Sequence, residues 1–301
     1  MSLDYLAYDK ANGRLWIPAG DTGSVDVLDV ASGKLTRIEG FKTAERDIRG
    51  KKRVLGPSSA TVGDGVVYIG NRATSELCAI DAVKLTRGAC ITLTVQPDGL
   101  LYVASTKELW ATAPRDKSIT VLDASTPAKL KAKTKITLDG QPEGYAVDEA
   151  HGIFFTNLED KDQTVSIDVK THKVTATLDA KCGSAGPRGL AFDAAKGFLF
   201  VACTTSVEVM DVAHGGAIVS KLDTGEGVDN IDFLDTKRQL YVAAGKAATL
   251  TVASVDDNGI LSLLGSAPTA QGTRVVVVDR DGGAYVADPM NGQVLAITPA
   301  P

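Results

Sequence analysis

Histidine and the large aromatic residues are scarce in this sequence of 301 residues. It has 3 His, 2 Trp, 7 Tyr and 7 Phe, so chemistry that needs a histidine base has few candidates. No run approaches the roughly 18 consecutive apolar residues of a membrane-spanning helix. A broad basic surface is also lacking, because 32 basic and 37 acidic residues leave a net charge of -5, which argues against nucleic acid as a partner.

Glycine, by contrast, is abundant, and a repeating pattern accompanies it. The 30 glycines and the lack of long helical patterns favour an all-β chain with many tight turns. An aromatic residue flanked by apolar residues recurs seven times, at spacings of 52, 42, 45, 45, 41 and 44 residues. The central residues are Trp16, Tyr68, Trp110, Phe155, Phe200, Tyr241 and Tyr285. Four strands in each unit of about 40–45 residues predict a seven-bladed β-propeller. Because single units cannot bury their own faces, we expect one domain over residues 1–301 and a monomer.

The seventh repeat is shorter than the others. Its last alternating stretch, Gln293 to Ile297, is followed by four residues, so we expect a last blade of three strands. The chain opens directly on an inner strand, Tyr5 to Tyr8, and its first residues lack the pattern of a signal peptide. We therefore expect a precursor that continues upstream of Met1 with a closing strand and an export signal.

The repeat resembles a known family. Its pattern is a strand ending in Asp, a short turn with Gly, a Leu-Tyr-Val-Ala type of strand, and then a Val-x-Val-(Ile/Leu/Met)-Asp strand. The clearest copies are Gly186 to Asp193 followed by Phe200 to Cys203, and Arg238 to Ala243. This is similar to the YVTN repeat of YncE-like and surface-layer propellers. The resemblance covers the whole chain and implies a bacterial, exported protein, many relatives of which have no assigned activity.

The four cysteines form two local pairs. Cys78 and Cys90 fall in neighbouring predicted strands with the midpoint of their positions in the connecting turn, so they can face each other within disulfide range. Cys182 and Cys203 are predicted at one rim of a single blade. Two disulfides would place the protein in the periplasm or outside the cell. The alternative is four buried free thiols in a cytosolic protein.

A binding site is expected where loops of several blades converge. Arg53, Arg188 and Arg274 directly precede predicted inner strands, and guanidinium groups there could hold a small anion. The alternative is that each arginine pairs with a carboxylate, such as Glu143 or Asp229, and merely fills the channel along the axis of the propeller. The full candidate set for ligand binding is Arg53, Arg115, Glu143, Asn157, Arg188, Asp229, Asn230, Arg274 and Asp288.

A second hypothesis concerns a metal. Glu143, Asn157, Asn230 and Asp288 supply hard oxygen atoms suited to Ca²⁺ or another divalent cation. The regucalcin and gluconolactonase propellers use a broadly similar set, so a metal-dependent, lactonase-type hydrolase is the alternative function. The three histidines fall in turns predicted on the opposite face, which favours a non-catalytic protein without a cofactor.

An insert accounts for the long first spacing. Six of the 13 residues from Phe41 to Arg53 are Lys or Arg, which indicates either a solvated loop or a lid or docking patch for an anionic partner.

Together these observations predict a non-catalytic propeller of a bacterial envelope. We expect it to bind a small anion or a protein segment, without a membrane span.

Overall fold

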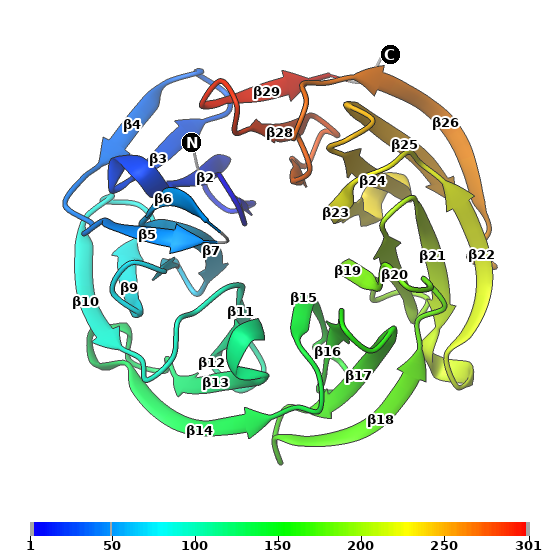
Figure 1. Cartoon of the computed structure of the whole chain (residues 1–301), viewed down its shortest axis with the longest axis horizontal. Helices are drawn as coiled ribbons and strands as arrows, with labels where there is room; N and C mark the ends of the chain where they lie inside the picture. Colours follow the sequence, from blue (N-terminus) through cyan, green and yellow to red (C-terminus); the bar gives the residue numbers. More distant parts are fainter. Residues whose placement is uncertain (1–2, 49, 299–301) are drawn as a thin grey trace. The chain divides into compact units, whose positions relative to one another are not determined.

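The computed structural model describes residues 3–48 and 50–298. The chain folds as an all-β, seven-bladed propeller, in which six blades have four antiparallel strands and the last has three (Figure 1). The predicted fold class, including the shorter last blade, is confirmed. Two compact units make up the chain, Met1–Thr137 and Leu138–Pro301. A single domain over 1–301 stays a prediction.

The first unit contains three blades and a separate two-stranded hairpin. Within each blade, strands that are consecutive in the chain pair with one another, and the first of them is termed the inner strand. The blades comprise β1 (Ala7–Asp9), β2 (Arg14–Ala19), β3 (Ser24–Asp29) and β4 (Leu35–Ile38); β7 (Pro57–Gly63), β8 (Val66–Asn71), β9 (Glu76–Asp81) and β10 (Arg87–Thr92); and β11 (Leu100–Val103), β12 (Glu108–Ala113), β13 (Ser118–Asp123) and β14 (Lys131–Thr137). The hairpin consists of β5 (Ala44–Ile48) and β6 (Lys51–Leu55), and the 3-10 turns are η1 (Gly20–Thr22), η2 (Pro114–Asp116) and η3 (Pro127–Lys129).

The second unit contains the remaining four blades. Their strands are β15 (Pro142–Asp148), β16 (Ile153–Leu158), β17 (Gln163–Asp168) and β18 (Lys173–Asp179); β19 (Pro187–Asp193), β20 (Phe198–Cys203), β21 (Ser206–Asp211) and β22 (Ala217–Asp223); β23 (Val228–Leu234), β24 (Gln239–Ala244), β25 (Thr249–Val255) and β26 (Leu261–Pro268); and β27 (Val276–Val278), β28 (Ala284–Asp288) and β29 (Gln293–Ile297). Two 3-10 turns, η4 (Val212–His214) and η5 (Asp235–Lys237), connect strands within blades.

The recurring aromatic residue lies in the second strand of every blade and is buried. Phe200 in β20 shares a core cluster with Leu240 and Val242 of the next blade, and Trp16 does so with Val67 and Ile69. Side chains in each cluster therefore come from two neighbouring blades, and burial of their apolar surface drives the blades together.

The aspartate that ends the third strand in the first five blades has a local role. Asp168 accepts hydrogen bonds from the backbone N–H groups of Thr171 (2.6 Å) and Lys170 (3.1 Å). The bond from the Thr171 backbone lowers the pKa of the Asp168 carboxyl, because it favours the charged form. Such side-chain to backbone bonds are typical of aspartate in turns, so this feature of the repeat shapes the turn into the outer strand.

Both predicted cysteine pairs form disulfides. Cys78 and Cys90 are direct cross-strand partners in β9 and β10, with Cα atoms 4.0 Å apart. Cys182 precedes β19 and is bonded to Cys203, the last residue of β20, with Cα atoms 5.1 Å apart. Two disulfides fit an oxidising, extracytoplasmic location. In the described part of the chain, no helix has both the length and the apolar character needed to cross a membrane.

Tyr68 provides a pH-dependent test of the core. Its side chain is fully buried and stacks on the Tyr102 ring with centroids 5.8 Å apart, and no hydrogen-bond partner for its hydroxyl lies among the described residues. Burial raises the pKa of Tyr68 to about 12. An unfolded tyrosine ionises near pH 10, so the stabilisation from this shift is complete below pH 10 and is lost as the pH rises towards 12.

We expect Tyr68→Phe to stabilise the fold by about 1 kcal/mol at pH 7, because it removes an unsatisfied buried hydroxyl. The free energy of unfolding of this variant should also fall less steeply between pH 10 and 12 than that of the unmodified protein. Urea unfolding at pH 7 and 11 measures both effects. The matched control is Tyr102→Phe, which removes a 2.8 Å hydrogen bond to Asp64 and should destabilise the protein. Equal effects of the two substitutions would contradict the interpretation.

Candidate functional site

One position, in or just before the inner strand, is charged in all blades but one. It lies three residues before the residue that pairs with the central aromatic, as Glu143 lies before Ala146, the partner of Phe155. In chain order the residues at this position are Asp4, Ser58, Asp98, Glu143, Arg188, Asp229 and Arg274. The last four belong to the second unit, where the sign of the charge alternates from blade to blade.

Glycines bring the inner strands of the second unit into close contact. Gly144, which follows Glu143, has a φ of +66°, and a Cβ there would lie 2.4 Å from the Arg188 carbonyl oxygen. A Cβ on Gly189, which follows Arg188, would lie 2.6 Å from the Asp229 carbonyl oxygen. The backbone N–H of Asn230 in turn donates to the Arg274 carbonyl, 3.0 Å away. Glu143, Arg188 and Asp229 therefore lie on successive, closely packed strands, and Arg274 lies two residues before the next inner strand.

A cavity of about 600 Å³ opens where the last three of these blades meet. Its lining includes Arg188, Asp229 and Arg274 from the predicted set, together with Thr204 and Lys246. Its volume falls within the range of small-molecule sites. Three cations and one carboxylate are among the lining residues, so groups that can bind an anion border the cavity.

The floor of this cavity is backbone. The N–H groups of Gly227, Gly245 and Gly272 donate in sequence to the carbonyl groups of Thr204 (2.8 Å), Gly227 (2.9 Å) and Gly245 (2.8 Å). This chain of bonds links loops of the fifth, sixth and seventh blades. Because glycine has no side chain, these residues leave the cavity open. The hydrogen bonds between the loops hold the cavity in shape before a ligand binds.

Each cation at the cavity has a carboxylate partner. Arg274 Nη1 lies 3.0 Å from Asp229 Oδ2, and Lys246 Nζ lies 2.5 Å from Glu226 Oε1. Arg188 pairs with Glu159 and also donates to the Ala185 carbonyl at 3.2 Å. The side chains of Arg274 and Lys246 remain 51% and 69% exposed, so a ligand in the cavity can reach them.

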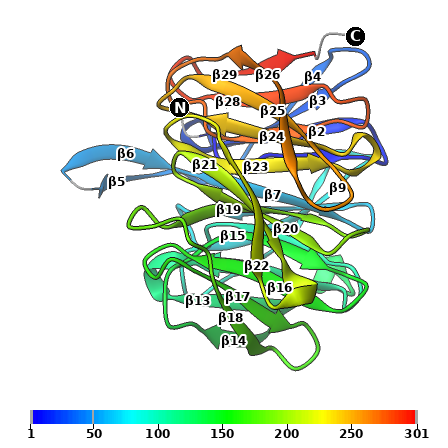
Figure 2. The same cartoon turned by 90° about the vertical axis from the view of Figure 1, so that its right-hand side faces the viewer.

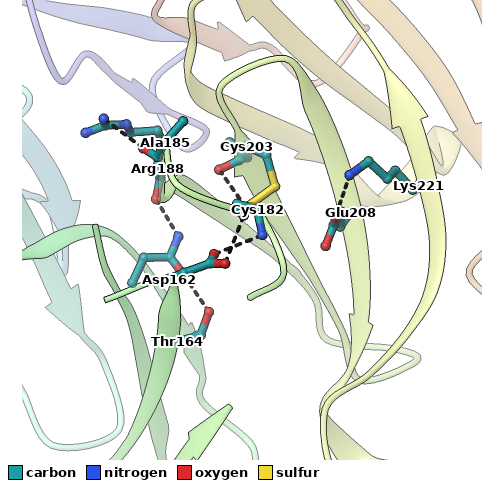
Figure 3. The surroundings of a disulfide bond; sticks show 11 residues. Asp162, Thr164, Cys182, Ala185, Arg188, Cys203, Glu208 and Lys221 are labelled. Atoms are coloured by element: carbon teal, nitrogen blue, oxygen red, sulfur yellow. Dashed lines mark hydrogen bonds and ion pairs between the residues drawn. A yellow bond between two sulfur atoms is a disulfide. The ribbon is translucent and has the colours of Figure 1, made fainter. Parts of the chain in front are cut away.

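A disulfide holds one wall of the cavity. The bond between Cys182 and Cys203 joins the loop that leads to Arg188 to the end of β20, one residue before Thr204 (Figure 3). Asp162 fixes the same loop by accepting hydrogen bonds from the N–H groups of Cys182 (2.9 Å) and Gly183 (2.8 Å). Arg188 and Thr204 are therefore positioned by a covalent link as well as by strand pairing.

The structure places the other predicted residues as follows. Arg53 lies in β6, exposed and outside the inner-strand position, which Ser58 occupies in that blade. Arg115 lies exposed in η2 of the first unit. Asn157 is buried next to Glu143, and its side chain donates to the Arg188 carbonyl and accepts from Thr164 at 2.6 Å. Asn230 uses its side-chain oxygen to accept the N–H of Ile231 at 2.8 Å.

Asp288 is also committed to the fold. It is fully buried and accepts hydrogen bonds from the side chains of Asn291 (2.7 Å) and Gln293 (3.1 Å). The bond from Asn291 lowers the pKa of Asp288. Among the described residues, no group of three or more His, Cys, Asp and Glu side chains is arranged to hold a metal ion. Because Asn157 and Asp288 are engaged with protein groups, the predicted oxygen set is a poor fit to a cation.

Two features lie outside the predicted set of binding residues. Lys246 lines the cavity from the loop after β24, and Met290 lines it with 76% of its surface exposed. In the first unit, Arg72 bridges Asp4 (2.9 Å) and Asp98. Burial raises the pKa of Asp98, although the positive charge of Arg72 opposes this shift. If the repeats are aligned on the inner-strand residue that pairs with the central aromatic, Asp4 and Asp98 fall at the same position as Glu143 and Arg188.

Comparison with known proteins establishes the fold and leaves the family open. No family model matches the sequence, and no curated protein does. A chain of the hydrazine synthase of Kuenenia stuttgartiensis is similar, with a TM-score of 0.82 and 15% identity, over 99% of this chain and 96% of that chain. A chain of a mitotic checkpoint complex gives 0.80 and 12%, over 98% and 86%. The β-propeller domain of Cps50 (Swd1) from Myceliophteria thermophila gives 0.76 and 9%, over 99% and 98%.

Proposed function

We propose that this protein is a non-catalytic binding propeller of the bacterial envelope, which takes a small anionic ligand into the cavity lined by Arg188, Lys246 and Arg274. The observation that carries the proposal is the cavity itself: three cations around a backbone floor that hydrogen bonds preform. Guanidinium and ammonium groups bind carboxylate and phosphate through charge-assisted hydrogen bonds.

Two features support the envelope setting. The disulfides Cys78–Cys90 and Cys182–Cys203 fit an oxidising compartment. The repeat also resembles that of the exported YncE-like propellers, as in the run from Gly186 to Asp193.

A protein segment that carries a carboxylate is the second candidate ligand. Met290 favours it, because this exposed side chain lines the cavity and offers an apolar contact beside the cations. Flexible methionine side chains adapt well to protein surfaces.

Substitution of Arg274 tests the proposal. Calorimetry and thermal shift against phosphate, citrate and succinate, with glucose as an uncharged control, should show binding of an anion by the unmodified protein. Arg274→Gln and Arg188→Gln should each weaken that binding about tenfold or more, the loss expected for a hydrogen bond to a charged group.

The control is Lys173→Gln, which removes a charge from an exposed position of β18 and should leave affinity unchanged. Equal affinity in all three variants would refute the site. Stabilisation by Ca²⁺ that Glu143→Ala abolishes would instead favour the metal-dependent hydrolase.

A further inference from the structure

The hairpin β5–β6 has two faces of different charge. Residues directly opposite each other on paired strands share a face. Arg46 pairs with Arg53, and Ile48 pairs with Lys51, so these four side chains lie on one face, termed the basic face. Ala44 and Leu55 pair on the same face. Among the described residues of the hairpin, this face therefore carries three cations, three apolar side chains and no carboxylate.

The opposite face holds the acidic residues of the hairpin. Glu45 pairs with Val54 and Asp47 with Lys52 across the strands. Lys52 Nζ lies 2.9 Å from Glu45 Oε1, and Asp47 accepts the backbone N–H of Gly50 at 2.8 Å. The opposite face thus carries two carboxylates and one lysine, whereas the described residues of the basic face include cations and no carboxylate.

The fold itself does not account for the basic face. Like charges placed directly opposite on paired strands destabilise a hairpin, and Arg46 and Arg53 are such a pair with both side chains exposed. Among the described residues, no carboxylate forms an ion pair with Arg46, Lys51 or Arg53. In this part of the chain, β5 and β6 also pair only with each other, which leaves exposed strand edges of the kind that recruit further strands.

The base of the hairpin is fixed while its strands project. Phe41 is buried, its N–H donates to the Gly23 carbonyl at 3.0 Å, and the Arg87 guanidinium lies 5.1 Å from its ring centroid. On the return side, the Gly56 carbonyl accepts the N–H of Arg72 at 3.0 Å. Figure 2 shows β5 and β6 extending past the strand β7 that follows them. The basic face is thus presented on a short arm with an anchored base.

We propose that the basic face of the β5–β6 hairpin docks an acidic, extended segment of a partner protein. In a strand, carboxylates at alternate positions share one face and can meet Arg46, Lys51 and Arg53. The apolar side chains of Ala44, Ile48 and Leu55 suit a partner with interleaved apolar groups rather than a phosphate backbone. Residues 42–55 contain no aromatic side chain and the chain is acidic overall, which argues against nucleic acid. The ligand cavity of the second unit is not involved.

Two neighbouring lysines give a matched test, because Lys51 lies on the basic face and Lys52 on the opposite one. The probe is a synthetic peptide of alternating Glu and Val, and its control replaces Glu by Gln. In calorimetry at low salt, the full chain should bind the Glu peptide and not the Gln peptide, and added salt should weaken the binding. The double variant Arg46→Gln/Arg53→Gln should reduce affinity about tenfold or more, and Lys51→Gln severalfold. Lys52→Gln should leave it unchanged.

All the substituted side chains are exposed, so thermal unfolding should be unaltered and would reveal a folding defect if one occurred. Equal losses for Lys51→Gln and Lys52→Gln, or no binding of the Glu peptide, would overturn the proposal. Tighter binding to phosphatidylserine vesicles or duplex DNA than to the Glu peptide would overturn it too.

Discussion

Gly144→Ala is expected to destabilise the protein by about 2–5 kcal/mol. Gly144 has a φ of +66°, a conformation that costs an alanine about 1–2 kcal/mol. Its new Cβ would lie 2.4 Å from the Arg188 carbonyl oxygen and 2.7 Å from the Gly189 Cα. Both atoms belong to the backbone of β19, so a strand must move rather than a side chain, which adds about 1–3 kcal/mol. Urea unfolding at neutral pH measures the loss.

Gly183→Ala is the matched control for this substitution. Gly183 also has a positive φ, +82°, but nothing lies within 4 Å of the place that a Cβ would take there. Gly183→Ala should show only the conformational cost, about 1–2 kcal/mol. Similar losses at the two positions would mean that the close approach of β15 and β19 contributes nothing.

Asp193→Ala should be nearly as damaging, with an expected loss of about 2–4 kcal/mol. Asp193 is buried at the end of β19, where it accepts the N–H of Ala195 at 3.1 Å and pairs with Arg238 of the next blade. Arg238 also donates to the carbonyls of Val255 (3.3 Å) and Asp256 (3.0 Å). The Arg238 side chain is half-buried, with 27% of its surface exposed, so removal of the carboxylate leaves a partly desolvated charge without its partner between two blades.

An exposed ion pair at the same boundary serves as the comparison. Lys196 Nζ lies 2.7 Å from Asp257 Oδ1, and the Asp257 side chain is 81% exposed. Asp257→Ala should leave the unfolding midpoint unchanged, since exposed pairs are screened by water. Asp193→Asn, which keeps an acceptor for Ala195, should lose less than Asp193→Ala. If the alanine variants at 193 and 257 behaved alike, burial of the Asp193–Arg238 pair would not matter.

Much of the fold could be predicted because the repeat consists of apolar and turn-forming residues at regular spacing. The position of Trp16, Tyr68 and their equivalents follows from burial, and strand alternation fixes the faces. The Cys78–Cys90 disulfide was also predictable, although a bulge between Arg87 and Cys90 is what makes the two cysteines direct partners. The bulge itself left no signal in the sequence.

The site was less predictable, since it depends on contacts between blades. The expected pairing of Arg274 with Asp229 is found at 3.0 Å, whereas Arg188 pairs with Glu159 rather than with Glu143 or Asp229. The sequence placed Arg53 in a loop next to an inner strand, whereas it lies in β6, which pairs with β5, another highly charged strand. Such a hairpin lacks the alternation of apolar and polar residues by which strands are recognised.

The alternating charges of the second unit have a consequence for assembly. Near-identical repeats risk docking in the wrong order while a chain folds. Glu143, Arg188 and Asp229 lie on the inner strands β15, β19 and β23, and Arg274 lies two residues before β27. A blade that skipped its neighbour would therefore place two like charges side by side. The sign of one charge per repeat thus disfavours the docking of non-consecutive blades, and so favours the order of the blades along the chain.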